Sequence, residues 1–174
     1  MPLESLPLKD SFACEVLGLP LWEPLGEETV HQLRDLWARH PVLVFRRQAL
    51  SEQELAQFSA HFGPLERVVR TEWASPAVPE IGLISNLKDG QARPIGGLRD
   101  GELQWHSDQS YMMNPATGAA LYAVELPPEG GTTSWVDLSA PIRRCLTGST
   151  TWSRAGAEFS AMSSGWPAIR ASTG

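Results

Sequence analysis

Two residues with metal-binding side chains, His106 and Asp108, stand two positions apart in the segment Trp105-His106-Ser107-Asp108. On an extended strand they would point to the same side, because successive side chains of a strand alternate between its faces. An imidazole nitrogen and a carboxylate oxygen on one wall of a pocket are two thirds of the 2-His-1-carboxylate set that holds non-haem Fe(II). The spacing therefore predicts two ligands of an iron site on a strand, although such a short motif also occurs on ordinary surface strands and turns.

The composition favours a soluble protein of the cytoplasm. The 174 residues are enough for one domain with a sizeable core, and the net charge of −6 argues against a nucleic-acid partner. Cys14 and Cys145 are too few for a disulfide scaffold and have no metal-binding spacing, which fits a reducing compartment. The amino terminus has no signal-peptide pattern, and no apolar stretch approaches the roughly 18 residues that span a bilayer. We therefore expect no membrane partner.

The first 65 residues predict two strands that alternate with two helices. Residues 12–18 alternate as a strand does, and the apolar run Val42–Phe45 is typical of a buried strand. Between them a helix is expected from Glu27 to the residue before Pro41, with an apolar stripe at helical spacing. The second helix is expected to begin with a capping box and to carry its own apolar stripe. The apolar stripe of the first helix consists of Val30, Leu33, Leu36 and Trp37. In the second helix the capping box is Ser51 and Glu54, and the apolar stripe is Leu55, Phe58 and Phe62.

The charged residues of this region are interpreted as structural. His31, His40 and His61 are expected at the surface or at helix ends rather than as metal ligands. Arg46 and Arg47 follow the second strand and are expected in a solvated turn.

The rest of the chain predicts short strands separated by turns that are rich in Gly and Pro. Strands are expected near residues 80–86, 118–126 and 132–138, and small residues in the second of these indicate close backbone packing. Residues 66–100 otherwise predict loops of the kind that often cover a substrate. Many short strands with helices on one side indicate an α+β protein, mainly β, with a double-sheet jelly roll.

Three segments together resemble the taurine dioxygenase (TauD/TfdA) family of Fe(II)- and 2-oxoglutarate-dependent oxygenases. They are residues 101–108 (GELQWHSD), 115–123 (PATGAALYA) and 125–135 (ELPPEGGTTSW). The resemblance runs from about residue 10 to about residue 140. It implies a double-stranded β-helix (a cupin-like jelly roll) with flanking helices, which would be incomplete in this chain.

The resemblance also implies a reaction and the residues that carry it. His106 and Asp108 would bind Fe(II), and the Thr133 hydroxyl would hydrogen-bond the co-substrate 2-oxoglutarate. With O₂, the enzyme would hydroxylate a small organic acid and release succinate and CO₂. Val68 and Thr71 stand where the taurine enzyme has the His and Tyr that hold the sulfonate, and Glu102 replaces an Asn near the substrate. Taurine is therefore not the expected substrate.

Two other functions remain open. A zinc hydrolase would also use His and carboxylate ligands, but the sequence has no HExxH-type helix and no cluster of Cys and His. A non-catalytic binding module would keep the fold without holding iron. No His follows His106, whereas the family's second His and its 2-oxoglutarate-binding Arg lie far downstream. The chain is compatible with a monomer or a homo-oligomer.

The sequence changes character at Pro141, which predicts two regions: a partial oxygenase domain at 1–140 and an atypical tail at 141–174. The tail has four arginines and one glutamate, a net charge of +3. The whole chain has a net charge of −6, so residues 1–140 carry −9. Back-translated and read one base earlier, the start of the tail permits Ala-Tyr-Thr-Ala-Leu-Pro-Asp-Gly-Leu, which resembles the helix that follows in this family. We therefore expect an out-of-frame, poorly ordered tail; an ordinary divergent tail is the alternative.

Overall fold

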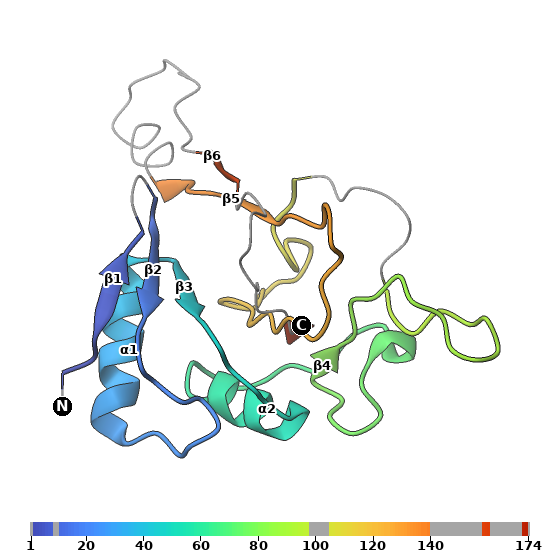
Figure 1. Ribbon diagram of the computed structural model, residues 1–174, viewed down its shortest axis with the longest axis horizontal. Helices are drawn as coiled ribbons and strands as arrows, with labels where there is room; N and C mark the ends of the chain where they lie inside the picture. The colour runs from blue at the N-terminus through green and yellow to red at the C-terminus, as the bar shows by residue number, and fades with distance from the viewer. Residues whose placement is uncertain (1, 9–10, 98–104, 140–157, 161–171, 174) are drawn as a thin grey trace.

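The computed structural model describes residues 2–8, 11–97, 105–139, 158–160 and 172–173, which form small sheets and two α-helices (Figure 1). The elements in chain order are β1 (Ser5–Pro7), β2 (Ala13–Val16), α1 (Glu27–Arg39), β3 (Val42–Phe45), α2 (Glu52–Ala60), the 3₁₀ turn η1 (Thr71–Trp73), β4 (Ile81–Gly82), β5 (Ser134–Val136), β6 (Glu158–Ser160) and β7 (Ser172–Thr173).

The amino-terminal layer is a three-stranded mixed sheet backed by a helix. β2 is the central strand, antiparallel to β1 and parallel to β3, with Cys14 opposite Leu43. A parallel pair needs a crossover, and α1 supplies it along one face of the sheet (Figure 1). Leu33 of α1 and Cys14 of β2 are fully buried in the shared core. The strands predicted at residues 12–18 and 42–45 are confirmed as β2 and β3, and the helix predicted between them is confirmed as α1.

The second helix begins as predicted. Ser51 is its N-cap, and the Ser51 hydroxyl accepts a hydrogen bond from the Glu54 backbone N–H. The Glu54 carboxylate in turn accepts the Ser51 backbone N–H at 2.6 Å, which completes the capping box. Glu54 thereby satisfies a backbone donor that the helix itself leaves unpaired.

Aromatic side chains hold α2 against the first layer. Phe58 contacts Phe45 of β3 and Phe62 edge-on, with ring centroids 5.3 and 5.4 Å apart. Phe62 contacts Trp37 of α1 in the same way, at 5.4 Å. Edge-to-face pairs add to the burial of the rings themselves. Trp37 from the predicted stripe of α1 therefore meets Phe58 and Phe62 from that of α2 in one aromatic cluster.

The segment after α2 packs beneath that helix. Leu55 of α2 forms a second buried cluster with Val78 and with Ile81 of β4. Ser75 is buried, and its hydroxyl bonds the Glu52 carboxylate in the first turn of α2. The predicted strand at 80–86 is real but short, because only Ile81–Gly82 is paired.

The predicted strand at 118–126 is wrong. Among the described residues no backbone ladder pairs this segment, and it packs on the helices instead. A β-carbon on Gly118 would lie 2.5 Å from the Trp37 ring, so the expected close backbone approach is present. The Tyr122 hydroxyl accepts the Leu50 backbone N–H at 3.0 Å and donates to the Gln48 carbonyl at 3.3 Å. These contacts hold the segment without a neighbouring strand.

The remaining strands form two small antiparallel sheets, in which β5 pairs with β6 and β4 pairs with β7. β5 confirms a strand within residues 132–138. The mixed α and β content matches the prediction, whereas the complete jelly roll stays a prediction. Residues 98–104 and most of 141–174, including Glu102 and Cys145, lie outside the described residues, so the expected disorder of the tail is untested.

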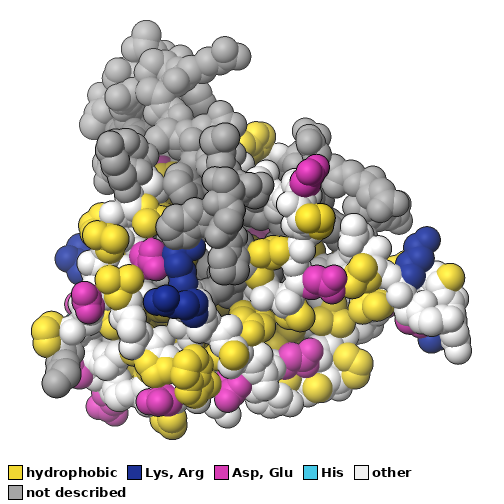
Figure 2. Space-filling view, in the orientation of Figure 1, with side chains coloured by type: hydrophobic (Ala, Val, Ile, Leu, Met, Phe, Trp, Pro, Cys, Tyr) yellow, Lys and Arg dark blue, Asp and Glu magenta, His cyan; other side chains and the backbone are white. Residues whose placement is uncertain are grey.

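Large hydrophobic side chains remain at the surface. Figure 2 shows them interspersed with acidic side chains on the visible face. They include Trp105, Tyr111, Met112 and Met113, which flank the His106–Asp108 segment. Neither helix in the described part of the chain is long and apolar enough to cross a bilayer.

We predict that Ser51→Ala lowers the free energy of unfolding by about 1 kcal/mol at neutral pH, as lost N-caps do. Hydrogen bonds from Ser51 lower the pKa of the Glu54 carboxyl. A lowered folded-state pKa contributes stability above the unfolded-state pKa and loses it as the pH falls through the folded-state pKa. The gap between wild type and variant should therefore narrow in acid. Urea unfolding at several pH values tests this, with Ser51→Thr as the control that keeps the cap.

We also predict that Tyr122→Phe destabilises the chain by about 1 kcal/mol, because the partly buried Leu50 N–H loses its acceptor. Tyr111→Phe is the matched control, since Tyr111 is 76% exposed. Thermal melts of the two variants make the comparison. Equal melting temperatures would show that the Tyr122 hydroxyl does not hold residues 118–126 in place.

Candidate metal centre

The two predicted metal ligands lie side by side, but on a turn rather than a strand. Residues 106 and 107 are irregular, and a turn begins at Asp108 in which the Met112 N–H donates to the Gln109 carbonyl at 2.8 Å. The strand expected here is therefore wrong. His106 and Asp108 nevertheless face each other. The turn brings their side chains together, rather than the alternation of side chains along a strand.

The distance between the two side chains suits a shared metal ion. His106 Nε2 lies 3.1 Å from Asp108 Oδ1, and the side chains are 55% and 70% exposed. Two ligand atoms that each lie ~2.1 Å from a divalent ion at a right angle are ~3.0 Å apart. The same distance is that of a hydrogen bond when no ion lies between them. Donor type and spacing thus fit two positions of the predicted iron site.

The described residues add no third ligand to this pair. Among them, no group of three or more His, Cys, Asp and Glu side chains comes close enough to hold a metal ion. Thr133, the predicted 2-oxoglutarate contact, is half-buried and immediately precedes β5. Its predicted role stays a prediction.

Gln109 connects the metal-ligand turn to two other segments. Its side-chain Nε2 donates to Glu66 Oε2 at 3.0 Å, and its Oε1 accepts the Ala116 N–H at 2.7 Å. Gln109 also has a left-handed backbone, with φ of 51°. Gln109 is thus held at its backbone carbonyl by the Met112 N–H, and at both ends of its side-chain amide by Glu66 and Ala116.

The other histidines have the structural places that were expected. His31 lies on the surface of α1, 3.3 Å from the Asp35 carboxylate, and His40 and His61 are the C-cap residues of α1 and α2. The expectation of a solvated turn at Arg46 is wrong. Its guanidinium Nε lies 2.9 Å from the Glu15 carboxylate, and both side chains are largely buried.

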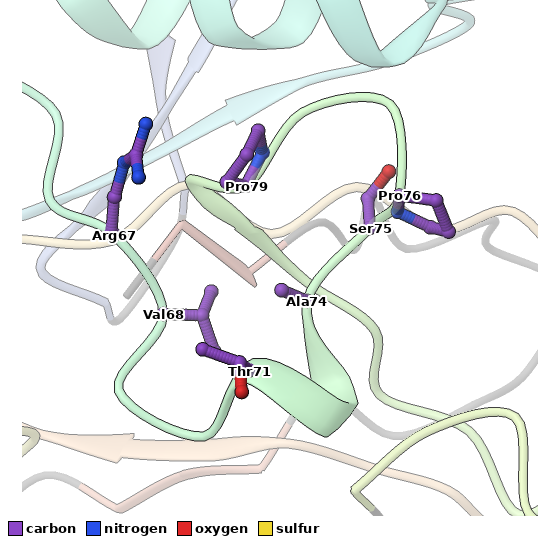
Figure 3. Close-up of a pocket in the computed structure, with 7 residues that line it drawn as sticks. All are labelled: Arg67, Val68, Thr71, Ala74, Ser75, Pro76 and Pro79. Carbon is purple, nitrogen blue, oxygen red and sulfur yellow. The ribbon is translucent and has the colours of Figure 1, made fainter.

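A pocket of about 370 Å³ opens beside the segment that leads into β4 (Figure 3). Its apolar lining comes from Val68, Ala74, Pro76 and Pro79, and its polar lining from Arg67, Thr71 and Ser75. Val68 and Thr71 are two of the positions at which the sequence departs from the taurine enzyme, and the structure brings both to one pocket. Trp105 is 61% exposed and is not in this lining.

Sequence reasoning missed Gln109, Glu66 and the Arg67 wall of the pocket. Glu66 and Gln109 are 43 residues apart, and neither belongs to a spacing pattern that points to the other. Their link depends on how α2 and the following segment fold back, which no local signal reveals. Glu66 adjoins Arg67, and Gln109 adjoins Asp108. One hydrogen bond therefore joins the pocket wall to the metal-ligand turn.

The chain is similar in sequence and in fold to known dioxygenases. The chain is 34% identical to an alpha-ketoglutarate-dependent 2,4-dichlorophenoxyacetate dioxygenase of Cupriavidus pinatubonensis, over 80% of this chain and 52% of the relative. It is 31% identical to an (S)-phenoxypropionate/alpha-ketoglutarate-dioxygenase of Sphingobium herbicidovorans, over 77% and 45% of the two chains. A crystal structure of a taurine dioxygenase from Burkholderia xenovorans superposes with a TM-score of 0.66 at 28% identity, over 85% and 52%.

The chain therefore spans about half the length of the curated relatives it matches. A family model described as "Taurine catabolism dioxygenase TauD, TfdA family" matches residues 4–145, and that match includes the His106–Asp108 turn and Thr133. This match means that the chain belongs to the TauD/TfdA family of dioxygenases.

Proposed function

We propose that this chain is part of an Fe(II)- and 2-oxoglutarate-dependent dioxygenase that hydroxylates a small organic acid. The observation that carries the proposal is the 3.1 Å approach of His106 Nε2 to Asp108 Oδ1 within the family motif. In the balanced reaction, one oxygen atom of O₂ enters the substrate as a hydroxyl. The other enters succinate as 2-oxoglutarate loses CO₂.

The chain's own residues would hold and orient the reactants. His106 donates an imidazole nitrogen and Asp108 a carboxylate oxygen to the iron, which supplies the O₂ chemistry when it is bound. The Thr133 hydroxyl donates a hydrogen bond to a carboxylate of 2-oxoglutarate. The remaining task is to place the substrate C–H near the metal and to exclude water. The β-strands described here would belong to the family's double-stranded β-helix.

The pocket beside η1 supports an acid with an apolar body as the substrate. Val68 and the two prolines give it apolar walls, and Arg67 brings a cation to its rim. The Arg67 guanidinium lies 3.6 Å from the Glu80 carboxylate and is largely exposed, so it remains accessible to a ligand. Phenoxyalkanoate dioxygenases among the relatives are named for substrates of this kind.

The proposed iron site needs a second His ligand in addition to His106 and Asp108. The printed sequence has no His beyond His106, and the relatives are about twice as long as the matched region. We propose that residues 141–174 are an out-of-frame translation and that the family frame encodes the missing His and Arg downstream. The family match ends at residue 145, close to the change in composition, which supports this view. An uninterrupted frame on resequencing, with no such downstream frame, would refute it.

The function is tested by adding Fe(II) and then 2-oxoglutarate without oxygen. An oxygenase gives the visible charge-transfer band of the chelate, and admission of O₂ with a phenoxyalkanoic acid then releases succinate. Hydrolysis that depends on Zn²⁺ would instead support the zinc enzyme. Absence of both metal binding and the band would identify a non-catalytic module.

We predict that His106→Ala or Asp108→Ala in the full-length protein abolishes Fe(II)-dependent succinate release, because each removes a metal ligand. His31→Ala is the matched control, since His31 has only a surface contact with Asp35. Succinate is measured by chromatography, and thermal melts check that the variants fold. Normal turnover by either ligand variant would disprove the assignment.

We predict that Thr133→Ala weakens 2-oxoglutarate binding by roughly 1.5–3 kcal/mol, the value of a hydrogen bond to a charged group. Fe(II) affinity should stay unchanged, because Thr133 is not a metal ligand. Titration of the charge-transfer band gives both constants, with Thr133→Ser as the control that keeps the hydroxyl. If the alanine variant binds 2-oxoglutarate as the wild type does, Thr133 has been misplaced.

A further inference from the structure

The turn that carries the two metal ligands has little support from secondary structure. His106 and Asp108 lie outside every strand, and both side chains are exposed. Gln109, which follows them, has φ of 51°, a region that residues other than glycine rarely occupy. Such a conformation persists only where the surroundings hold it. Something other than a sheet must therefore keep the ligands in register.

The Gln109 side chain provides that support from both ends of its amide. The Glu66 carboxylate can only accept a hydrogen bond, and the Ala116 N–H can only donate one. The partners therefore dictate the orientation of the amide: Nε2 toward Glu66 at 3.0 Å and Oε1 toward Ala116 at 2.7 Å. Because the two bonds point to different segments, the side chain links the turn both to the chain that follows it and to the segment after α2.

The far end of this link is itself anchored. Glu66 precedes Arg67 and Val68, which line the pocket, and the Val68 N–H donates to the Pro79 carbonyl at 3.1 Å. Pro79 precedes Glu80 and β4, which packs under α2 through Ile81. The hydrogen bond from Gln109 thus ties the turn to a packed part of the fold rather than to another loose loop.

We infer that Gln109 is a positioning residue of the metal centre, whose amide fixes the His106–Asp108 pair against the Glu66 end of the pocket wall. The inference rests on the proposed function, because it concerns a metal that those two ligands hold. Gln109 is not one of the residues proposed to bind the metal or the co-substrate. It acts through the backbone of the turn, so that the two ligands are preorganised and stand at a set place relative to the pocket.

The test uses four variants of the full-length protein, with Mn²⁺ alone as the probe. Gln109→Ala removes both bonds. Gln109→Glu keeps the acceptor for Ala116 but sets a carboxylate against Glu66. The double variant Glu66→Gln with Gln109→Glu reverses the polarity, so that the new amide donates to the new carboxylate. The matched control is Gln57→Ala, an exposed glutamine of α2 with no recorded side-chain hydrogen bond.

Three measurements are made on each variant: Mn²⁺ affinity from the electron paramagnetic resonance of free Mn²⁺, amide hydrogen exchange at Ala116, and the melting temperature. We expect both single Gln109 variants to bind Mn²⁺ about 10–100-fold more weakly, the usual effect of losing a partner that orients a ligand. Gln109→Ala should also lose protection at Ala116. The double variant should recover most of the affinity, and Gln57→Ala should match the wild type.

The outcomes separate this inference from the proposed function. Wild-type protein that binds no Mn²⁺ overturns both. Wild-type affinity in Gln109→Ala, with only a lower melting temperature, overturns the inference alone, because the residue would then be merely structural. If Gln109→Ala does not fold, the comparison of Gln109→Glu with the double variant decides. No recovery of affinity in the double variant would then overturn the inference.

Discussion

The packing of the Phe58 ring is the interaction on which the rest of the structure depends. Its ring meets Phe45 on β3 and Phe62 at the end of α2, and Phe62 meets Trp37 on α1. This continuous set of edge-to-face contacts joins the first sheet and both helices. The Trp37 ring then lies so close to Gly118 that only glycine fits there. The aromatic cluster therefore reaches from the amino-terminal sheet to the chain just beyond the metal-ligand turn.

The metal-ligand turn is held by polar contacts at the edge of this platform. Packing places the segments on both sides of it: residues 118–122 lie on the helices, and residues 66–81 lie under α2. Gln109 then joins the turn to the second of these segments through Glu66. The proposed iron site needs open positions for the co-substrate and O₂, and the exposed side chains of His106 and Asp108 are compatible with that need. In the proposed enzyme, the pocket wall next to Glu66 would hold the substrate.

Local patterns predicted the amino-terminal half well because its signals are local. The capping box at Ser51 and the apolar stripes of α1 and α2 depend on residues three or four positions apart. Pro41 could end α1 without help from the fold. The later strands were harder to predict, because a strand exists only where a partner supplies its hydrogen bonds. Residues 118–126 have a strand-like sequence, yet they pack on helices through Gly118 and Tyr122.

The sequence by itself determined the family and the candidate site, which is an imidazole and a carboxylate two residues apart in a segment that the family model matches. It also predicted the role of Thr133 and the departures at Val68 and Thr71. Only the tertiary structure decided that a turn presents the ligands, that Val68 and Thr71 share a pocket with Arg67, and that Gln109 reaches Glu66. The physical reason is the distance along the chain over which each signal acts. The chemistry of a side chain depends on a residue and its neighbours in sequence, whereas a contact between residues 43 positions apart forms only after the helices pack.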